Sequence, residues 1–577
     1  MMIAKQGITA WLILLISYVA MNGCTSAEET LPADLVISGG VIYTMDDAAP
    51  RVQAVAVRGE KIVFAGDEEG ALAYTGDQTR RIDLQGKTMT PGWVEGHGHF
   101  MGMGYNKLNL DLLQVRSYQE MIDKVAEAVA QAEPGEWIYG RGWHQSKWNM
   151  PEEEMIKGFP THDRLSEVSP DNPVVLRHAS GHALIANSKA MEVAGVLPMS
   201  TESIQGTELE GGEVIRDAMG NPTGVFNERA MGLINKFVPE STPERDRKAF
   251  DLAVKNCWEH GITAFHDAGV GRETINMYQQ IRSSDSLGVR LYVMVTGFEP
   301  DYVEEWFQRG PQIDSAGWLT IRSVKLNCDG ALGSRGAWLL EPYTDRPDHY
   351  GHETLPMSVV ADMAEKGLEY GFQICSHAIG DRANREILDR YEAALVANPE
   401  EATDHRYRIE HAQHLHPDDI PRFGELGVIP AMQAIHMASD RPWAIDRLGE
   451  QRIVEGAYVW QKLLQSGARI VNGTDVPVEP IDPIASYYAS VARKTLEGTP
   501  PEGYEPDQRM SREEALRSYT LDAAYGAFME DLTGSIEVGK LADFTVLDQD
   551  IMTVPESEIL NTNVVMTIID GKVVYEK

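Results

Sequence analysis

Histidines, an acid and a lysine recur at or beside the ends of predicted strands in this 577-residue chain. Imidazole and carboxylate groups are ligands that Zn²⁺ and similar divalent ions accept. His97 and His99 are two positions apart, so in a strand they point to the same side and can grip one cation, with Gly98 leaving room between them. The candidate metal ligands are His97, His99, Lys325, His377, His411 and Asp475.

Each of these residues alone has a structural explanation. A strand histidine is more often a hydrogen-bonded core residue than a ligand, Asp475 could cap a helix, and Lys325 could pair with an acid. Taken together, buried polar groups without partners would cost about 1–3 kcal/mol each, and a metal ion removes that cost. The set exceeds what one tetrahedral zinc needs, which favours two ions, with one ion as the alternative. Between two dications, Lys325 would have to be neutral or converted to an anion.

The middle of the chain alternates strand and helix patterns. Helical periodicity is evident at 118–132, 243–260, 359–370 and 381–397. Apolar strand-length runs occur at 90–97, 262–267, 289–295, 319–326, 372–377, 407–411, 428–432 and 468–475. Eight strands with helical crossovers predict an α/β fold, the (β/α)8 TIM barrel, in which the carboxyl ends of the strands share one mouth. We expect this barrel over residues 91–535, with a long insertion after strand 1 at about residues 100–260.

Both ends of the chain are rich in strand-like runs. The N-terminal runs are at 35–43, 52–57 and 61–65, and the C-terminal runs are at 541–547, 564–569 and 572–575. Asp570-Gly571 is a tight-turn signal between the last two runs. Because the two ends of a domain often lie close together, residues 34–90 and 536–577 predict one small composite β-sandwich.

The N-terminus resembles a targeting signal. Residues 8–21 are largely apolar, which is the length of a signal-peptide core and short for a membrane span. The run ends at Met21-Asn22-Gly23-Cys24, and a small residue directly before a cysteine is typical of a bacterial lipoprotein cleavage site. We predict a signal peptide at 1–23, lipidation of Cys24 and a linker at 24–33; an ordinary signal peptide is the alternative. The protein is then expected to be exported and lipid-anchored on the periplasmic or cell-surface side of a bacterial membrane.

The formal net charge of −36 restricts the partners. So acidic a chain should repel nucleic acid, and it has no long basic run to override that repulsion. We expect a small-molecule substrate that is not polyanionic. A homodimer is left open, because the sequence does not determine the oligomeric state.

Six segments resemble motifs of the amidohydrolase superfamily, in the order in which that family has them. Residues 91–99 (PGWVEGHGH) are similar to its first metal motif. The others resemble its N-substituted formamide deformylase-like branch: 324–335 (VKLNCDGALGSR), 377–381 (HAIGD), 408–411 (RIEH), 473–475 (GTD) and 534–544 (GSIEVGKLADF). The resemblance extends over about residues 34–577.

The resemblance implies a role for each candidate ligand. His97 and His99 would bind the more buried metal together with Asp475, and a carboxylated Lys325 would bridge both metals. The second metal would be held by His377 and His411. Water activated by the metal would attack a substrate carbonyl, and Asp475 would carry a proton to the leaving amine.

Two further residues are weaker candidates for substrate binding. His182 resembles a family segment that faces the active site, and Arg335 could hold a substrate carboxylate; a hydrogen-bonded loop histidine and a loop salt bridge are the alternatives. The implied activity is metal-dependent hydrolysis, with one or two Zn²⁺, of a non-peptide carbon–nitrogen bond in an amide or an N-formyl or N-acyl amine. Hydrolysis of an ester, lactone or cyclic imide, metal-assisted isomerisation, and a non-catalytic lipid-anchored solute-binding barrel are the alternatives, since fold and metals do not fix the substrate.

Overall fold

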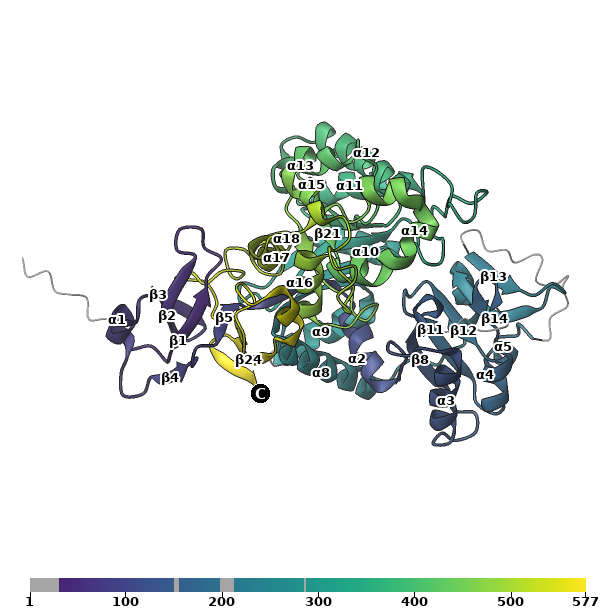
Figure 1. Ribbon diagram of the computed structural model, residues 1–577, viewed down its shortest axis with the longest axis horizontal. Coiled ribbons are helices and arrows are strands. Elements are labelled where there is room, and N and C mark those ends of the chain that lie inside the picture. The colour runs from purple at the N-terminus through teal and green to yellow at the C-terminus, as the bar shows by residue number, and fades with distance from the viewer. Residues whose placement is uncertain (1–30, 150–154, 198–211, 285–286) are drawn as a thin grey trace, which may run out of the picture.

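The computed structural model describes residues 31–149, 155–197, 212–284 and 287–577. Figure 1 shows a central body of strands and helices, a β-sheet on one side that contains both ends of the described chain, and a smaller lobe on the other side. Cys24, the predicted lipidation site, lies outside the described residues.

The central body is a nearly closed barrel of eight parallel strands. In chain order these are β6 (Trp93–Gly98), β15 (Ile262–Val270), β16 (Arg290–Thr296), β18 (Leu319–Asn327), β19 (Gln373–Ala378), β20 (Arg408–His411), β21 (Ile429–Met432) and β22 (Val471–Asn472). Each strand pairs in parallel with the next one in this order. The strands are apolar along most of their length because helices cover them outside and side chains fill the inside. The predicted (β/α)8 barrel is confirmed.

Helices surround the barrel, and local sequence signals set their ends. Helix α8 (Pro243–Glu259) begins after Thr242, whose side chain accepts a hydrogen bond from the backbone of Arg245. Helix α11 (Met357–Tyr370) ends at Gly371 in the left-handed conformation, with φ of 76°. The other barrel helices are α9 (Arg272–Ser284), α10 (Pro300–Arg309), α12 (Asp381–Ala397), α13 (Ile420–Leu426), α14 (Ala434–Gly456), α15 (Trp460–Gln465), α16 (Pro483–Ala492), α17 (Arg512–Ser518) and α18 (Leu521–Gly526).

The barrel closes where β22 meets β6. The amide of Asp475 donates to the carbonyl of His97 at 2.8 Å, so two candidate ligands are hydrogen-bonded through their backbones at this seam. Glycine is required at Gly96, because a Cβ there would lie 2.3 Å from the carbonyl oxygen of Asn472. Closure therefore places residues almost 400 positions apart in the sequence side by side.

Strands from both ends of the chain form one eight-stranded sheet. They are β1 (Leu35–Tyr43), β2 (Arg51–Arg58), β3 (Lys61–Gly66), β4 (Arg80–Asp83), β5 (Thr88–Pro91), β23 (Phe544–Leu547), β24 (Val564–Ile569) and β25 (Lys572–Glu576). Strand β23 pairs antiparallel with β5, which joins the two ends. The strands predicted as a small sandwich are thus hydrogen-bonded as a single sheet, around an apolar core with side chains from both ends. A buried ion pair at 2.6 Å between Arg290 of β16 and Asp543, the residue before β23, connects this sheet to the barrel.

The insertion between β6 and β15 forms the lobe. It starts with α2 (Phe100–Leu108), and α8 leads back to the barrel. Its other main elements are β7 (Leu110–Asp111), α3 (Tyr118–Val129), β8 (Ile138–Trp143), α4 (Asp163–Val168), β11 (Val174–His178), β12 (Ala183–Ala186), α5 (Ser188–Val193), β13 (Gly212–Arg216) and β14 (Pro222–Glu228). Six strands make one sheet in the order β13-β14-β12-β11-β8-β7. The lobe has its own apolar core, which includes Trp143 and Trp148.

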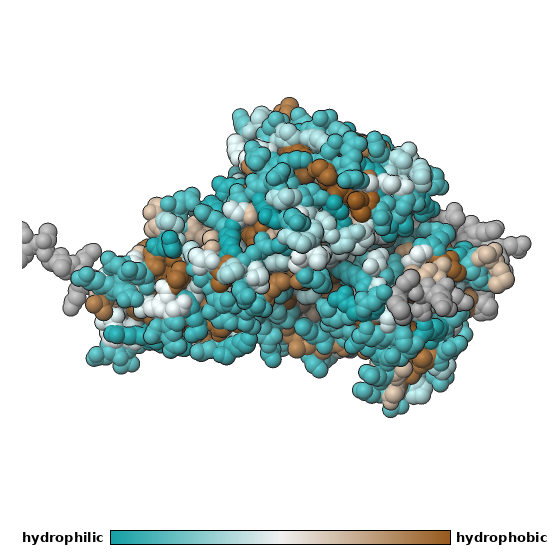
Figure 2. Space-filling model, viewed as in Figure 1, coloured by the Kyte–Doolittle hydropathy of each residue, from teal (hydrophilic) through white to brown (hydrophobic). Residues whose placement is uncertain are grey.

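The surface is mostly polar. On the face shown in Figure 2, hydrophilic residues predominate and hydrophobic residues occur in scattered groups. Across the described part of the chain, every helix is too short or too polar to cross a membrane.

Candidate metal centre

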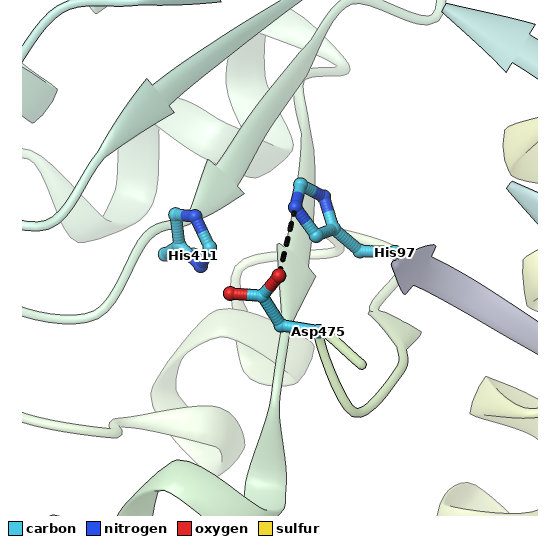
Figure 3. A group of neighbouring side chains, drawn as sticks. All are labelled: His97, His411 and Asp475. Carbon is cyan, nitrogen blue, oxygen red and sulfur yellow. Dashed lines mark ion pairs between the residues drawn. The ribbon is translucent and has the colours of Figure 1, made fainter. Parts of the chain in front are cut away.

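Three candidate ligands converge at the mouth of the barrel. His97 lies on β6, His411 ends β20, and Asp475 follows β22. All three are buried, and one ligand atom of each lies within 4.8 Å of those of the others. Figure 3 shows their side chains around a common space, with His97 Nε2 and Asp475 Oδ1 3.7 Å apart. Imidazole nitrogens and a carboxylate oxygen at this spacing can hold one divalent ion.

His99 and Lys325 extend this group. His99 Nε2 lies 3.2 Å from Asp475 Oδ1, and its Nδ1 is 3.0 Å from the carbonyl oxygen of Ala268. The Lys325 ammonium lies 3.4 Å from Nε2 of His97 and is almost fully buried. The structure therefore brings the lysine to the same space as the ligands, where a carboxylated lysine would supply oxygen donors.

His377 and His411 form the other side of the group. Their ring centroids are 4.4 Å apart. His411 Nδ1 lies 2.7 Å from Gln433 Oε1, which leaves Nε2 for a metal. His377 Nε2 lies 3.3 Å from Oδ1 of Asp329, a carboxylate that is itself held by the backbone amides after His377. All six predicted ligands are thus assembled at one mouth.

Glu410 contacts the ring nitrogen of His97 that faces away from the candidate metal space, and sequence analysis missed this role. Its carboxylate contacts Nδ1 of His97 and accepts hydrogen bonds from Arg408 Nε at 2.7 Å and Nη2 at 2.9 Å. With Nδ1 engaged, the Nε2 atom of His97 faces the candidate metal space. Arg408 also reaches the carbonyl of Gly96 and Nδ1 of His266, so His266 lies behind the ligands. The signal in the sequence was that Arg408 and Glu410 are two apart on one strand face.

Burial keeps the histidines in the form that binds metals. It lowers the pKa of His97 to about 4, with the Lys325 charge acting in the same direction. Burial also lowers the pKa values of His377 and His411. For Asp475, burial raises the pKa, but interactions with His99, His97 and His411 outweigh it and hold the pKa well below its usual range. Neutral imidazoles beside an ionised carboxylate are the protonation states that a cation requires.

The donor atoms fit a metal ion. Asp475 Oδ1 and His377 Nε2 are buried and form no well-aligned hydrogen bond within the described residues. Unsatisfied polar atoms in this position are costly, and coordination to a cation removes the cost. We conclude from the donor chemistry and from these orphaned atoms that the residues present fit one or two divalent ions.

The backbone at the centre is strained. His411 and Asp475 have φ values of 77° and 58°, a left-handed region that non-glycine residues seldom adopt. Next to Asp475, Gly473 leaves space for the buried carboxylate of Glu95, since a Cβ there would lie 2.3 Å from Glu95 Oε1. Glu95 in turn accepts hydrogen bonds from the amide and hydroxyl of Thr474, each at 2.7 Å. Glu95 thus supports the backbone that carries Asp475.

The candidate metal centre lies in a cavity of about 810 Å³ that residues of the barrel and of the insertion lobe line. His182, which lies in the lobe, lines this cavity, and its ring centroid is 5.6 Å from that of His377. Its Nδ1 is 2.8 Å from Glu228 Oε2. Burial lowers the pKa of His182, but the Glu228 carboxylate more than offsets this, so that the pKa is raised. The Glu228 carboxylate therefore favours the charged form of the imidazole that faces the centre from the lobe.

Arg335 lies elsewhere. It is absent from the described residues that line the cavity, and its guanidinium forms a salt bridge with Asp345 at 2.8 Å. The loop salt bridge, which was the alternative for this residue, is what the structure contains. The cavity instead contains Arg141, Arg177 and Trp443, which no local motif indicated because their positions depend on how the lobe is placed over the barrel.

Comparison with known proteins agrees with this geometry. The model of the amidohydrolase family matches residues 80–575. The chain belongs to the amidohydrolase family. It is 32% identical to Protein LONG AFTER FAR-RED 3 of Arabidopsis thaliana over 94% of this chain and 92% of that protein. It is 27% identical to N-substituted formamide deformylase of Arthrobacter pascens over 94% of this chain and 98% of that enzyme.

A solved structure is also similar to this amidohydrolase. It is an uncharacterized metal-dependent hydrolase from Pyrococcus horikoshii OT3, with a TM-score of 0.71 and 26% identity over 90% of this chain and 99% of that one. The resemblance drawn from the motifs is therefore confirmed. Family membership and this neighbour support hydrolase activity that depends on a metal.

Proposed function

We propose that this amidohydrolase cleaves a non-peptide carbon–nitrogen bond in an amide, most simply an N-formyl or N-acyl amine. The observation that carries the proposal is the convergence of six ligand-type side chains, with orphaned buried donor atoms, at the base of a cavity of about 810 Å³. A structural barrel has no need of such a group at the mouth where barrel enzymes place their catalytic residues.

The residues divide into two sets of ligands. His97, His99 and Asp475 would hold one ion, which we take to be Zn²⁺. His377 and His411 would hold a second, with Lys325, once carboxylated, between the two. When bound, the metal lowers the pKa of water towards about 7 and polarises a carbonyl oxygen.

Two side chains would handle the proton and the developing charge. Asp475 is ionised and points to the ligand space, so it can accept a proton from the attacking water and deliver it to the leaving nitrogen. His182, whose charged form Glu228 favours, lies on the lobe side of the cavity near His377. It is placed to stabilise negative charge that develops on the substrate oxygen.

Metal content is the test of this assignment. The protein, purified with bicarbonate and reloaded with Zn²⁺, is expected to contain one or two ions per chain by elemental analysis and to release amines from a panel of N-formyl and N-acyl amines. Lys325→Met should lower the content towards one ion. His377→Ala and Asp475→Asn should lose activity, whereas His260→Gln, at the far end of α8, should retain both properties.

Other outcomes would change the proposal. Turnover of esters, lactones or cyclic imides but not of amides would keep the metal centre and change the bond cleaved. Metal binding with no hydrolysis in any class would favour a solute-binding barrel. Absence of metal after reloading would overturn the proposal.

We also propose that the protein is exported and anchored to a bacterial membrane by a lipid on Cys24. Support comes from the apolar run at 8–21 and the Gly23-Cys24 junction. In a bacterial host, radiolabelled palmitate is expected to be incorporated into the parent and not into Cys24→Ser. Equal labelling of the two proteins would reject the anchor.

A further inference from the structure

Two arginines stand side by side on the lobe wall of the cavity. Arg141 of β8 and Arg177 of β11 are register partners in a parallel pair, and both line the cavity above the metal centre. Side chains at paired positions point to the same face of a sheet, and like charges placed in this way destabilise it. Burial lowers the pKa of Arg141 to about 10, and the neighbouring charge of Arg177 acts in the same direction.

Neither arginine has a carboxylate partner among the described residues. Arg141 donates from Nη2 to the carbonyl of Ala179 at 3.0 Å, and its Nε has no hydrogen-bond partner among the residues that the structure describes. The side chain of Arg177 is exposed, and it forms neither an ion pair nor a hydrogen bond with a described residue. Asp111, the register partner of Arg141 on the other side of β8, accepts from the amide of Leu113 and makes no ion pair with it.

Most other charged groups of the cavity have partners among the described residues. Lys147 pairs with Glu479 at 2.6 Å, and His182 pairs with Glu228. Asp329 and Asp475 belong to the metal centre, and Arg229 donates to the carbonyl of Thr354. Asp440, on α14, is the acid without a cation contact, and its hydrogen-bond partner is the hydroxyl of Ser439. The arginine pair is therefore uncompensated positive charge in a chain whose net charge is −36.

Arg141 is also close to the candidate metal centre. A Cβ on Gly181 would lie 3.6 Å from Arg141 Nη2, so the guanidinium packs against the loop that leads directly into His182. Arg141 is near enough to the metal centre for the charge of Asp475 to act on its pKa. A short ligand can therefore reach the arginines with one end and the metal ligands with the other.

We infer that Arg141 and Arg177 bind the carboxylate of the substrate, which makes this protein a hydrolase of N-formylated or N-acylated amino acids. Two planar guanidinium groups suit the two oxygens of a carboxylate and would be relieved of their mutual repulsion by it. The acyl group at the α-nitrogen would then point towards His97, His411 and Asp475. For the bond that is cleaved, this inference rests on the proposed hydrolase function. The binding of the carboxylate by the two arginines does not depend on that function.

Binding is tested with a probe that cannot be hydrolysed. Racemic N-methanesulfonyl-phenylalanine and its neutral N-methylamide are titrated calorimetrically into the full metal-loaded chain. The parent is expected to bind the acid at least about tenfold more tightly than the N-methylamide. Arg141→Met and Arg177→Met should each reduce this preference about tenfold or more, and Arg177→Lys should retain part of it. Arg247→Met, which removes an exposed arginine from α8, is the control and should behave as the parent.

Stability separates a binding role from a structural one. Because each substitution removes one of two repelling charges, Arg141→Met and Arg177→Met should keep the melting temperature of the parent in the absence of ligand. A preference that survives both substitutions, equal binding of acid and N-methylamide, or no binding of the acid overturns the inference. Failure of the proposed function would appear differently, as no amine release from N-formyl-phenylalanine by a protein that still prefers the acid probe in an arginine-dependent way.

Discussion

Replacing Glu410 by glutamine should weaken metal binding and destabilise the fold by two separable routes. Glu410 is fully buried between Arg408 and His97. Losing its charge leaves the buried Arg408 cation without a counter-ion, which costs about 3–5 kcal/mol. Losing the carboxylate behind His97 removes the group that fixes the ring of a metal ligand, which typically lowers metal affinity about 10–100-fold.

The two effects are measured separately. Urea denaturation of the metal-free protein gives the loss in unfolding free energy, and competition with a chelator gives the dissociation constant for Zn²⁺. Asp543→Asn is the matched control, because Asp543 pairs with the equally buried Arg290 outside the metal centre. It should lose stability, somewhat less because Asp570 still contacts Arg290, and keep the parental Zn²⁺ affinity.

A double variant sharpens the test. Arg408→Met with Glu410→Gln removes the stranded cation and should recover part of the stability, while the weak Zn²⁺ binding persists. The reasoning is refuted if Glu410→Gln binds Zn²⁺ as tightly as the parent, or if Asp543→Asn loses as much affinity as Glu410→Gln does.

Three more predictions concern pH, the seam and the loop. The pKa of His97 is about 4 in the fold and about 6.5 in the unfolded chain, so between these values the unfolded chain binds a proton that the folded protein does not. The free energy of unfolding is therefore at its full value above pH 6.5 and decreases as the pH falls towards 4. At pH 5 the free energy of unfolding is lower by about 2 kcal/mol through this residue alone, which is seen as a lower melting temperature of the metal-free protein than at pH 7.5. A melting temperature that does not change between these pH values would contradict this prediction. Gly96→Ala places a Cβ 2.3 Å from the Asn472 carbonyl and should lower the unfolding free energy by about 1–3 kcal/mol or more and weaken Zn²⁺ binding, and unchanged values would mean that the seam can relax. Arg335→Met should leave KM unchanged, because Arg335 pairs with Asp345, and a large rise in KM would return Arg335 to the substrate site.

The sequence by itself determined the barrel and the identity of the candidate ligands. The helix predicted at 381–397 is observed as α12 with the same bounds, and the strand predicted at 319–326 is observed as β18, one residue longer. These signals are local: apolar runs of strand length, helical periodicity and the pair His97 and His99 can be read from a few neighbouring residues. The rule that strand ends share a mouth then placed the ligands together.

Only the tertiary structure decided which groups support, surround and charge the centre. Glu410 precedes His411, and neighbours on a strand face opposite sides, yet both serve the centre; the strand ends at His411, whose φ of 77° departs from the strand conformation. Arg141 and Arg177 are 36 positions apart, and their alignment follows from the register of two parallel strands, which no local pattern specifies. Arg335 shows the converse, since a residue within a family-like motif is held by Asp345 instead. Contacts of this kind depend on strand register and on the docking of the lobe, which are set by packing across the whole chain.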